Sequence, residues 1–295
     1  MPWLELTCTA PRSAAEHLIT QLEALGALAV TMKDAADQPV LEPKPGEVRL
    51  WEATAVTGLF EADADPEALI AALRRNLAAD IPLTCSAMPV PDEDWVQRSL
   101  DQFTPLRFGQ RLWVVPQWHS PPDPSAINVI LNPGLAFGTG THPTTAMCLE
   151  WLDSNPVADL TVVDFGCGSG VLAIAAALLG AKQVLAIDHD PQAIEATLAN
   201  AMLNEVTDRI RFATREALPV GGCDVILANI LAGPLMELAP HFAQLLRTGG
   251  RLMLSGVLVN QAQSVAACYQ PWFTISVARE QEEWVRLDAV RTPAT

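Results

Sequence analysis

The sequence predicts an α/β protein in which a parallel, doubly wound sheet follows a small α+β domain. From Thr161 onward, short apolar strands alternate with helical patterns, which indicates parallel strands with helices on both faces of their sheet. The N-terminal region carries a different order, in which two strands follow each other directly between two helices. The chain has 295 residues and half of them are apolar, so it can fill two hydrophobic cores.

The N-terminal region reads as β-α-β-β-α-β. Apolar and polar residues alternate over residues 3–9, as in a half-buried strand, and a helical pattern then runs to Gly26. Asp65 is a good N-cap for a second helix, and Pro66 fits its first turn. The remaining strands are expected from Val30 and over residues 48–60 and 82–90. This order is that of a split-βαβ, ferredoxin-like domain, which we place at residues 1–91.

A short helical pattern at residues 92–103 follows two prolines, and we expect it to form a linker helix. The second domain then spans residues 104–295 and begins with strands at residues 111–116 and 127–131, separated by a proline-rich turn. Further strands are expected at residues 162–165, 184–188, 210–214, 225–229 and 251–257, the last after a turn at Gly249 and Gly250. Helices are expected from Gly170, from Pro191 and over residues 261–269. An antiparallel pair at residues 273–279 and 283–290 ends the chain.

The composition argues against export, a membrane span and a metal site. The N-terminus lacks the basic stretch and apolar core of a signal peptide, and the longest apolar run is too short to cross a bilayer. The six cysteines form no CxxC pair, and the five histidines show no metal-ligand spacing. We therefore expect a cytoplasmic protein with reduced thiols, no metal and no membrane partner.

The formal net charge of −16 gives the molecule a strongly negative field. Such a field repels phosphate backbones and attracts basic partners, which favours a basic protein substrate over direct nucleic-acid binding. The same charge is equally well explained by solubility alone.

Ligands of an open α/β sheet bind beyond the carboxyl ends of its strands, so the residues that end those strands are the informative ones. Here they are Asp164, Asp188 and Asn229. Asp164 opens a loop with glycines at positions 166, 168 and 170, between a strand and a helix. Glycine permits positive φ and lets a ligand approach the backbone closely.

The spacing of these glycines indicates which class of cofactor the loop binds. A dinucleotide fingerprint needs glycine where Val171 stands, and the loop lacks the Lys-Ser/Thr ending of a nucleoside triphosphate site. The acidic-x-Gly-x-Gly-x-Gly pattern resembles instead the first motif of class I methyltransferases, which have a Rossmann-like sheet and use S-adenosyl-L-methionine (SAM). Asp164, Gly166, Gly168 and Gly170 are therefore candidate cofactor-binding residues.

Asp188 ends the second strand of the parallel sheet, some twenty residues beyond the loop, where a carboxylate can accept hydrogen bonds from both ribose hydroxyls. The alternative is that Asp188 or Asp190 only caps the helix beginning at Pro191. We assign the cap to Asp190 and the ribose contact to Asp188.

Asn229 follows a buried apolar run, and an amide in that place needs a partner or a ligand. Its position matches the fourth motif of amine methyltransferases. Enzymes that act on nucleobases usually carry Asn-Pro-Pro and an aromatic residue there, whereas Ile230, Leu231 and Ala232 follow in this chain. We expect Asn229 to be the catalytic residue that orients an aliphatic amine.

A second glycine-rich segment, residues 132–145, precedes a helix that runs toward Trp151. Its threonines can cap that helix, but so many glycines, prolines and threonines are costly to order without a function. Phe137 is expected to cover the cofactor. The hydroxyl groups of Thr141, Thr144 or Thr145 are expected to bind its carboxylate at the helix N-terminus.

These motifs together resemble the family of methyltransferases that act on large-subunit ribosomal protein eleven (L11). The resemblance rests on GLAFGTGTHPTT at residues 134–145, DFGCGSG at 164–170, DHDP at 188–191, NILAGP at 229–234, and the EDW and EEW triplets ending at Trp95 and Trp284. It covers nearly the whole chain.

What this resemblance implies is SAM-dependent methylation of lysine ε-amines and the N-terminal α-amine of L11, up to trimethylation, with the N-terminal domain recognising the substrate, free or on the ribosome. By position, Thr145, Gly166, Asp188 and Asn229 hold the cofactor. The adenine contact stays open, because Glu216 matches no fixed pattern.

In such a reaction a neutral amine displaces the methyl group in line, and the enzyme mainly supplies position and environment. Deprotonating a lysine at pH 7 costs about 4 to 5 kcal/mol. The motifs contain no convincing general base, so we expect solvent to take the proton. His142 is a candidate base, although a loop-stabilising role is favoured.

Three other functions share parts of this pattern. An RNA or DNA methyltransferase is disfavoured by the acidic charge and by the missing aromatic residue after Asn229. A noncatalytic adapter that binds a ribosomal protein uses the same fold without turnover. A dinucleotide oxidoreductase is disfavoured by the spacing of the glycines.

Overall fold

The computed structural model describes residues 3–36, 52–77, 81–90, 103–132, 140–214 and 220–293. The chain divides into two compact units, Met1–Leu100 and Asp101–Thr295. The linker helix expected at residues 92–103 falls almost wholly outside the described residues, so the boundaries at residues 91 and 104 stay predictions.

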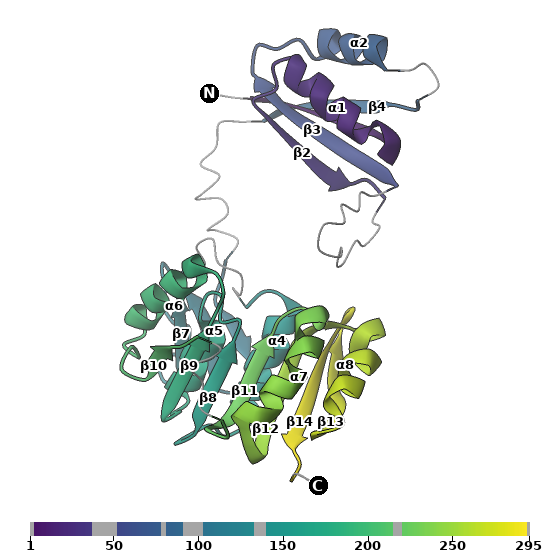
Figure 1. Ribbon diagram of the computed structural model, residues 1–295. Helices are drawn as coiled ribbons and strands as arrows, with labels where there is room; N and C mark the ends of the chain where they lie inside the picture. The colour runs from purple at the N-terminus through teal and green to yellow at the C-terminus, as the bar shows by residue number, and fades with distance from the viewer. Residues whose placement is uncertain are drawn as a thin grey trace. The chain divides into compact units, whose positions relative to one another are not determined.

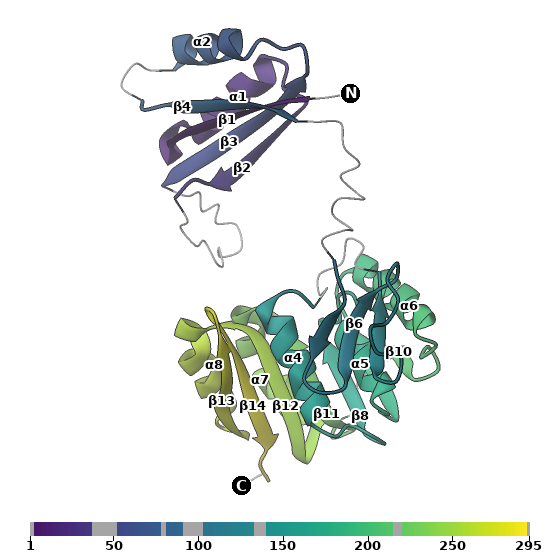
Figure 2. The ribbon, with the colours of Figure 1, turned by 180° about the vertical axis from the view of Figure 1, so that it is seen from behind.

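The N-terminal unit has the predicted split-βαβ, ferredoxin-like fold. Its sheet has the order β2-β3-β1-β4 with antiparallel neighbours. Helix α1 lies in front of this sheet in Figure 1 and behind it in Figure 2, and α2 contributes to the same core. The elements are β1 (Trp3–Pro11), α1 (Arg12–Ala24), β2 (Ala29–Asp34), β3 (Ala53–Glu61), α2 (Pro66–Asn76) and β4 (Thr84–Val90).

Strict alternation explains how this sheet faces its helices. Every second residue of β1 and β3 is buried, and these side chains form one core with the apolar faces of α1 and α2. Asp65 caps α2 as predicted, since its carboxylate accepts hydrogen bonds from the backbone amides of Glu67 and Ala68.

The second unit is built on a seven-stranded sheet with the order β10-β9-β8-β11-β12-β14-β13. The pairs from β10 to β12 are parallel, and β14 runs antiparallel to both β12 and β13. The strands are β8 (Thr161–Phe165), β9 (Gln183–Ile187), β10 (Ile210–Phe212), β11 (Cys223–Asn229), β12 (Leu246–Leu258), β13 (Phe273–Gln281) and β14 (Trp284–Arg291). A separate three-stranded sheet contains β5 (Leu106–Phe108), β6 (Leu112–Pro116) and β7 (Ile127–Leu131).

Helices cover both faces of the seven-stranded sheet, which confirms the predicted doubly wound α/β class. One core joins the sheet to α4 (Pro143–Ser154), α5 (Val171–Leu178) and α6 (Pro191–Leu203). The other joins it to α7 (Ala232–Leu245) and α8 (Ala262–Tyr269). Figure 1 shows α7 and α8 in front of the strands, and Figure 2 shows α4 from the opposite side. No helix among the described residues is long and apolar enough to cross a membrane.

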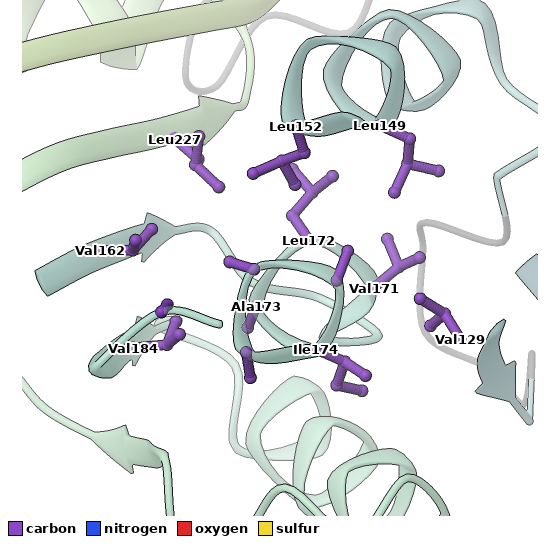
Figure 3. Close-up of a cluster of buried hydrophobic side chains, with 14 of the residues drawn as sticks. Val129, Leu149, Leu152, Val162, Val171, Leu172, Ala173, Ile174, Val184 and Leu227 are labelled. Atoms are coloured by element: carbon purple, nitrogen blue, oxygen red, sulfur yellow. The ribbon is translucent and has the colours of Figure 1, made fainter. Parts of the chain in front are cut away.

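Helix α5 fixes the position of the glycine loop. It lies in the middle of the buried cluster in Figure 3, between the sheet residues Val162, Val184 and Leu227 and residues of α4 and β7. All of its residues from Val171 to Ala177 are buried. A helix that is apolar on every side must be enclosed, so the loop before it is anchored on a rigid core.

Strand β5, helix α7 and the start of strand β12 differ from the sequence prediction, and β5 was not expected at all. Helix α7 was not predicted, because Gly233, Pro234 and Pro240 interrupt its pattern, although the structure accommodates Pro240 inside the helix. Strand β12 begins at Leu246, so Gly249 and Gly250 lie within it and not in a turn before it. Gly249 has a φ of 76°. The register between β11 and β12 shifts at this place, because Cys223 pairs with Leu246 and Val225 pairs with Arg251. A glycine that only bends a strand resembles a turn signal in the sequence.

Candidate active site

A cavity of about 860 Å³ opens at the carboxyl ends of β8, β9 and β11. The strand order reverses between β8 and β11, because β9 and β10 extend to one side and β12 to the other. Ligands of open α/β sheets bind at such a reversal. The described residues that line the cavity are His142, Thr144, Phe165, Gly166, Ile187, Asp188, His189, Ala213, Thr214, Asn229, Ile230, Leu231, Pro234, Glu237, Leu238, Gly256 and Trp284.

The glycine loop that follows β8 needs its glycines. Gly166, Gly168 and Gly170 all have positive φ, from 53° to 81°, a region that is costly for other residues. A Cβ atom on Gly166 would lie 2.4 Å from Cγ2 of Ile230, and one on Gly170 would lie 2.7 Å from Cγ2 of Thr197. Gly166 lies at the cavity wall, so its bare backbone is open to a ligand.

Asp188 ties the end of β9 to this loop. Its Oδ2 accepts a hydrogen bond from the amide of Gly168 at 3.0 Å, and its Oδ1 accepts one from the amide of Asp190 at 3.1 Å. The Asp188 side chain is 9% exposed and lines the cavity. Its Oδ1 also lies 3.3 Å from Nδ1 of the exposed His189 ring, whereas Oδ2 has a second lone pair that the described contacts do not use.

Asp190 has the role of helix cap that we assigned to it. It is the N-cap of α6, and its Oδ1 accepts a hydrogen bond from the amide of Gln192 at 2.9 Å. Because the cap belongs to Asp190, the Asp188 carboxylate is left for the cavity.

Asp164 is buried beneath the loop. Its Oδ2 accepts a hydrogen bond from the amide of Ala173 at 2.9 Å, and its Oδ1 has no hydrogen-bond partner among the described residues. Burial raises the pKa of the Asp164 carboxyl to about 7, the bond from Ala173 opposes this rise, and the charge of Asp188 adds to it. A buried acceptor left unpaired beside a cofactor loop fits a ligand that carries a positive charge.

The raised pKa of Asp164 predicts how the ligand-free protein depends on pH. Below pH 3.8 the carboxyl is protonated in both states; between that pH and about 7 only the unfolded chain loses the proton. The free energy of unfolding should therefore fall by about 4 kcal/mol as the pH rises through this window, and this contribution should then level off. We expect the difference in unfolding free energy between the wild type and Asp164→Asn to show that fall. Urea titrations followed by hydrogen exchange of α5 measure it, and a difference that does not vary with pH would contradict the prediction.

Asn229 ends β11 and faces the helix that follows the second glycine-rich segment. Its Nδ2 donates a hydrogen bond to Oγ1 of Thr145 over 3.4 Å, and Thr145 is buried in the first turn of α4. The amide oxygen of Asn229 has no hydrogen bond to any residue that the structure describes. It therefore presents an acceptor at the cavity wall.

His142 has the loop-stabilising role that we favoured. It is the N-cap of α4, and its Nδ1 lies 2.8 Å from Oγ1 of Thr144 and 3.3 Å from the amide nitrogen of the same residue. Its ring packs edge-on against Trp284, with ring centroids 5.0 Å apart. A role as general base stays a prediction.

The structure brings most of the predicted site residues together. Gly166, Asp188, Asn229 and Thr144 line one cavity. Thr145 and Gly168 form hydrogen bonds with the lining residues Asn229 and Asp188. Asp164 and Gly170 belong to the same strand, loop and helix start as Gly166. Thr141 is exposed, is not among the described lining residues and borders a small hollow lined by Leu106 and Leu131, so its role stays a prediction. Phe137 and Glu216 lie outside the described residues.

Pro234, Glu237, Gly256 and Trp284 are among the cavity residues to which sequence reasoning assigned no role. Gly256 has a φ of 79°, and a Cβ atom there would lie 2.4 Å from the carbonyl oxygen of Ile230. A lone glycine inside the apolar run of β12 was the signal for this close approach. Trp284 reaches the cavity because β14 pairs with β12 at Leu258, a pairing that the sequence does not specify.

Three features define a class I methyltransferase with a Rossmann-like sheet. The strand order reverses between β8 and β11, an acidic and glycine-rich loop follows β8, and an asparagine ends β11. The family model described as ribosomal protein L11 methyltransferase (PrmA) matches residues 2–292. The chain belongs to this family and is a methyltransferase.

Named relatives agree with this family over the full length of the chain. A protein named ribosomal protein L11 methyltransferase from Marinobacter nauticus is 50% identical over 299 residues, which cover 99% of each chain. One of the same name from Azotobacter vinelandii is 49% identical, over 99% of this chain and 100% of the relative. A crystal structure of ribosomal protein L11 methylase from Lactobacillus delbrueckii subsp. bulgaricus matches with a TM-score of 0.58 and 32% identity, over 65% of this chain and 100% of the other.

Proposed function

We propose that the protein transfers methyl groups from SAM to lysine ε-amines and to the N-terminal α-amine of L11. The observation that carries this proposal is Asn229: it lines the cavity, and its amide oxygen has no hydrogen bond to any described residue, in a chain that belongs to the L11 methyltransferase family. The residues after Asn229 are aliphatic, and Ile230 and Leu231 line the cavity where base-modifying enzymes carry a stacking aromatic ring.

The cavity fits SAM in size and chemistry. Its volume lies within the range of small-molecule sites, roughly 300 to 1,000 Å³, and its walls are mostly apolar. Asp188 would hold the ribose, the backbone at Gly166 would border the methionyl part, and Asp164 and Thr145 would lie behind that part. The apolar wall of Phe165, Ala213 and Leu238 offers a surface for the adenine ring.

SAM supplies an electrophilic methyl group when it is bound, and the protein's own residues prepare the amine. The Asn229 oxygen accepts a hydrogen bond from the amine nitrogen, which turns the nitrogen lone pair toward the methyl group. An amine that packs against Ile230 and Leu231 loses part of its hydration, which lowers its pKa by desolvation. This recovers part of the roughly 4 to 5 kcal/mol that deprotonation of a lysine at pH 7 costs, and solvent takes the proton.

The charges around the cavity suit a cationic substrate. Asp188 and Glu237 line it, and neither lysine nor arginine is among its described lining residues. Glu237 is exposed on α7 and has no ion pair with any residue in the described part of the chain. A basic protein is therefore attracted to the cavity mouth, and a phosphate backbone is repelled.

Glu237→Gln is expected to raise the KM for L11 about threefold at low salt and to leave the affinity for SAM unchanged. The reason is that one exposed carboxylate attracts a cationic substrate by a fraction of a kcal/mol to about 1 kcal/mol. Steady-state kinetics in rising salt measure the effect, which should fade as the charges are screened. Glu195→Gln, an exposed glutamate on α6 outside the cavity, is the matched control. An equal change in both variants would rule out a role for Glu237.

The N-terminal unit is proposed to recognise L11, with residues 1–91 as the recognition domain, 92–103 as a linker helix and 104–295 as the catalytic domain. The helices in the described part of this unit pack on one face of its ferredoxin-like sheet, and the opposite face, where the β1 residues are half-buried, is the surface that we assign to the partner. We place the reaction in the cytoplasm, on L11 that is free or assembled in the ribosome, without direct binding of nucleic acid or membrane. A cluster of at least three metal-ligating side chains is not found among the described residues, and the proposed transfer needs no metal.

Intact-mass spectrometry of unmethylated L11, incubated with the protein and SAM, tests the proposed function. We expect mass gains in methyl steps on L11, no labelling of rRNA incubated in parallel, and no gain with Asp188→Ala. Methylated rRNA, or SAM binding without transfer to L11, would overturn the proposal.

A further inference from the structure

Two thiols face each other across the sheet of the N-terminal unit. Cys8 on β1 and Cys85 on β4 are direct partners in the antiparallel register, and their Sγ atoms lie 3.2 Å apart. Directly opposed residues of antiparallel strands have Cα atoms about 4.5 to 5.5 Å apart, which lies within the range that a disulfide spans. The two sulfurs can therefore bond without movement of the backbone.

The surroundings give the two thiols different properties. The contact with Cys8 lowers the pKa of Cys85, burial opposes this, and the positive charge of Arg74 on α2 adds to the lowering. The same contact and burial raise the pKa of Cys8. Cys85 is half-buried and open to small reagents, whereas Cys8 is fully buried in the core beneath the helices. Cys85 has the character of an attacking thiolate, and Cys8 that of a resolving thiol.

We infer that Cys8 and Cys85 form a site of reversible oxidation, at which a peroxide converts the two thiols into a disulfide. The Cys85 thiolate attacks one oxygen of hydrogen peroxide; the O–O bond breaks, an S–O bond forms, and hydroxide leaves. Cys8 then attacks the Cys85 sulfur; the S–S bond forms, the S–O bond breaks, and the thiol proton leaves with the oxygen as water. Two thiols lose two electrons in total, and the peroxide is reduced to water.

Each of the remaining cysteines lacks a neighbouring thiol, a lowered pKa or both. Burial raises the pKa values of Cys167 and Cys223 to about 12 and that of Cys148 further still, so these thiols stay protonated and inert. Cys268 is half-buried, and no contact between its sulfur and another thiol is found among the described residues. It serves as a control for exposure alone within the same molecule.

The test is peroxide titration of the full-length wild-type protein, followed by peptide mapping without reductant. We expect a peptide that links Cys8 to Cys85, that dithiothreitol separates, and that forms before Cys268 is modified. Because a disulfide between positions 77 apart constrains the unfolded chain, the oxidised protein should also show an N-terminal unit whose Tm is higher by about 10 to 20 °C.

Two variants separate the roles of the thiols. In Cys8→Ser the resolving thiol is missing, so dimedone should trap sulfenic acid at Cys85. In Cys85→Ser, Cys8 should stay unmodified. The inference is overturned if both thiols in the wild type remain free to alkylate at a peroxide concentration that oxidises Cys268, or if wild-type peptides show Cys85 linked to a cysteine other than Cys8.

Discussion

Asp188→Ala is expected to weaken the binding of SAM about 100- to 1,000-fold and to abolish methyl transfer at ordinary SAM concentrations. Two hydrogen bonds from ribose hydroxyls to a carboxylate together contribute about 3 to 4 kcal/mol. The loop loses support as well, because Asp188 also accepts the amide hydrogen of Gly168. Isothermal titration calorimetry with SAM measures the change.

Asp190→Ala is the matched control for this experiment. It removes a carboxylate two positions away that caps α6, so it should cost about 1 kcal/mol of stability and leave the affinity for SAM nearly intact. Comparable loss of SAM affinity in both variants would mean that Asp188 acts only by supporting the backbone. An unchanged affinity in Asp188→Ala would remove it from the cofactor site.

Asn229→Ala is expected to lower kcat by about 100-fold, with a change of only a few fold in the affinity for SAM. The variant lacks the oxygen that orients the amine, and displacement of a reacting group by about 1 Å can cost that much. The hydrogen bond to Thr145 is also lost, so the side chain positions both the amine and the first turn of α4. Single-turnover rates at saturating SAM separate this loss from weaker binding.

Asn229→Asp gives the second readout of the same residue. It keeps an acceptor oxygen but places a negative charge beside the amine, which favours the ammonium form and raises its pKa. The pH profile of kcat should therefore move to higher pH, whereas Asn229→Ala should only lower it. A profile that stays in place in both variants would show that Asn229 does not touch the amine.

Local signals predicted most of the fold. Alternation in β1 and β3, the cap at Asp65 and the glycines before α5 each act over a few residues, so they can be read without knowledge of the tertiary structure. The order of the seven strands depends on contacts between distant segments, and no local pattern specified it. Helix α7 was not predicted because Gly233, Pro234 and Pro240, which usually end helices, lie within it.

The site residues that could be predicted are those at the ends of strands. Asp188 and Asn229 end strands and line the cavity as expected. Thr141 was grouped with Thr144 and Thr145 because they are neighbours in sequence, but α4 begins at Pro143, and its first turn carries only the latter two to the cavity side. Glu237 and Trp284 reach the cavity from α7 and β14, through packing that only the folded chain displays.

A crystal structure of the protein with S-adenosylhomocysteine tests the central claim most directly, because this product carries the ribose, the adenine and the sulfur of SAM. The account predicts the ligand in the cavity at the ends of β8, β9 and β11, with both ribose hydroxyls on the Asp188 carboxylate and the sulfur facing Asn229. A ligand bound elsewhere, or a ribose held by other side chains with Asn229 turned away from the sulfur, would contradict it.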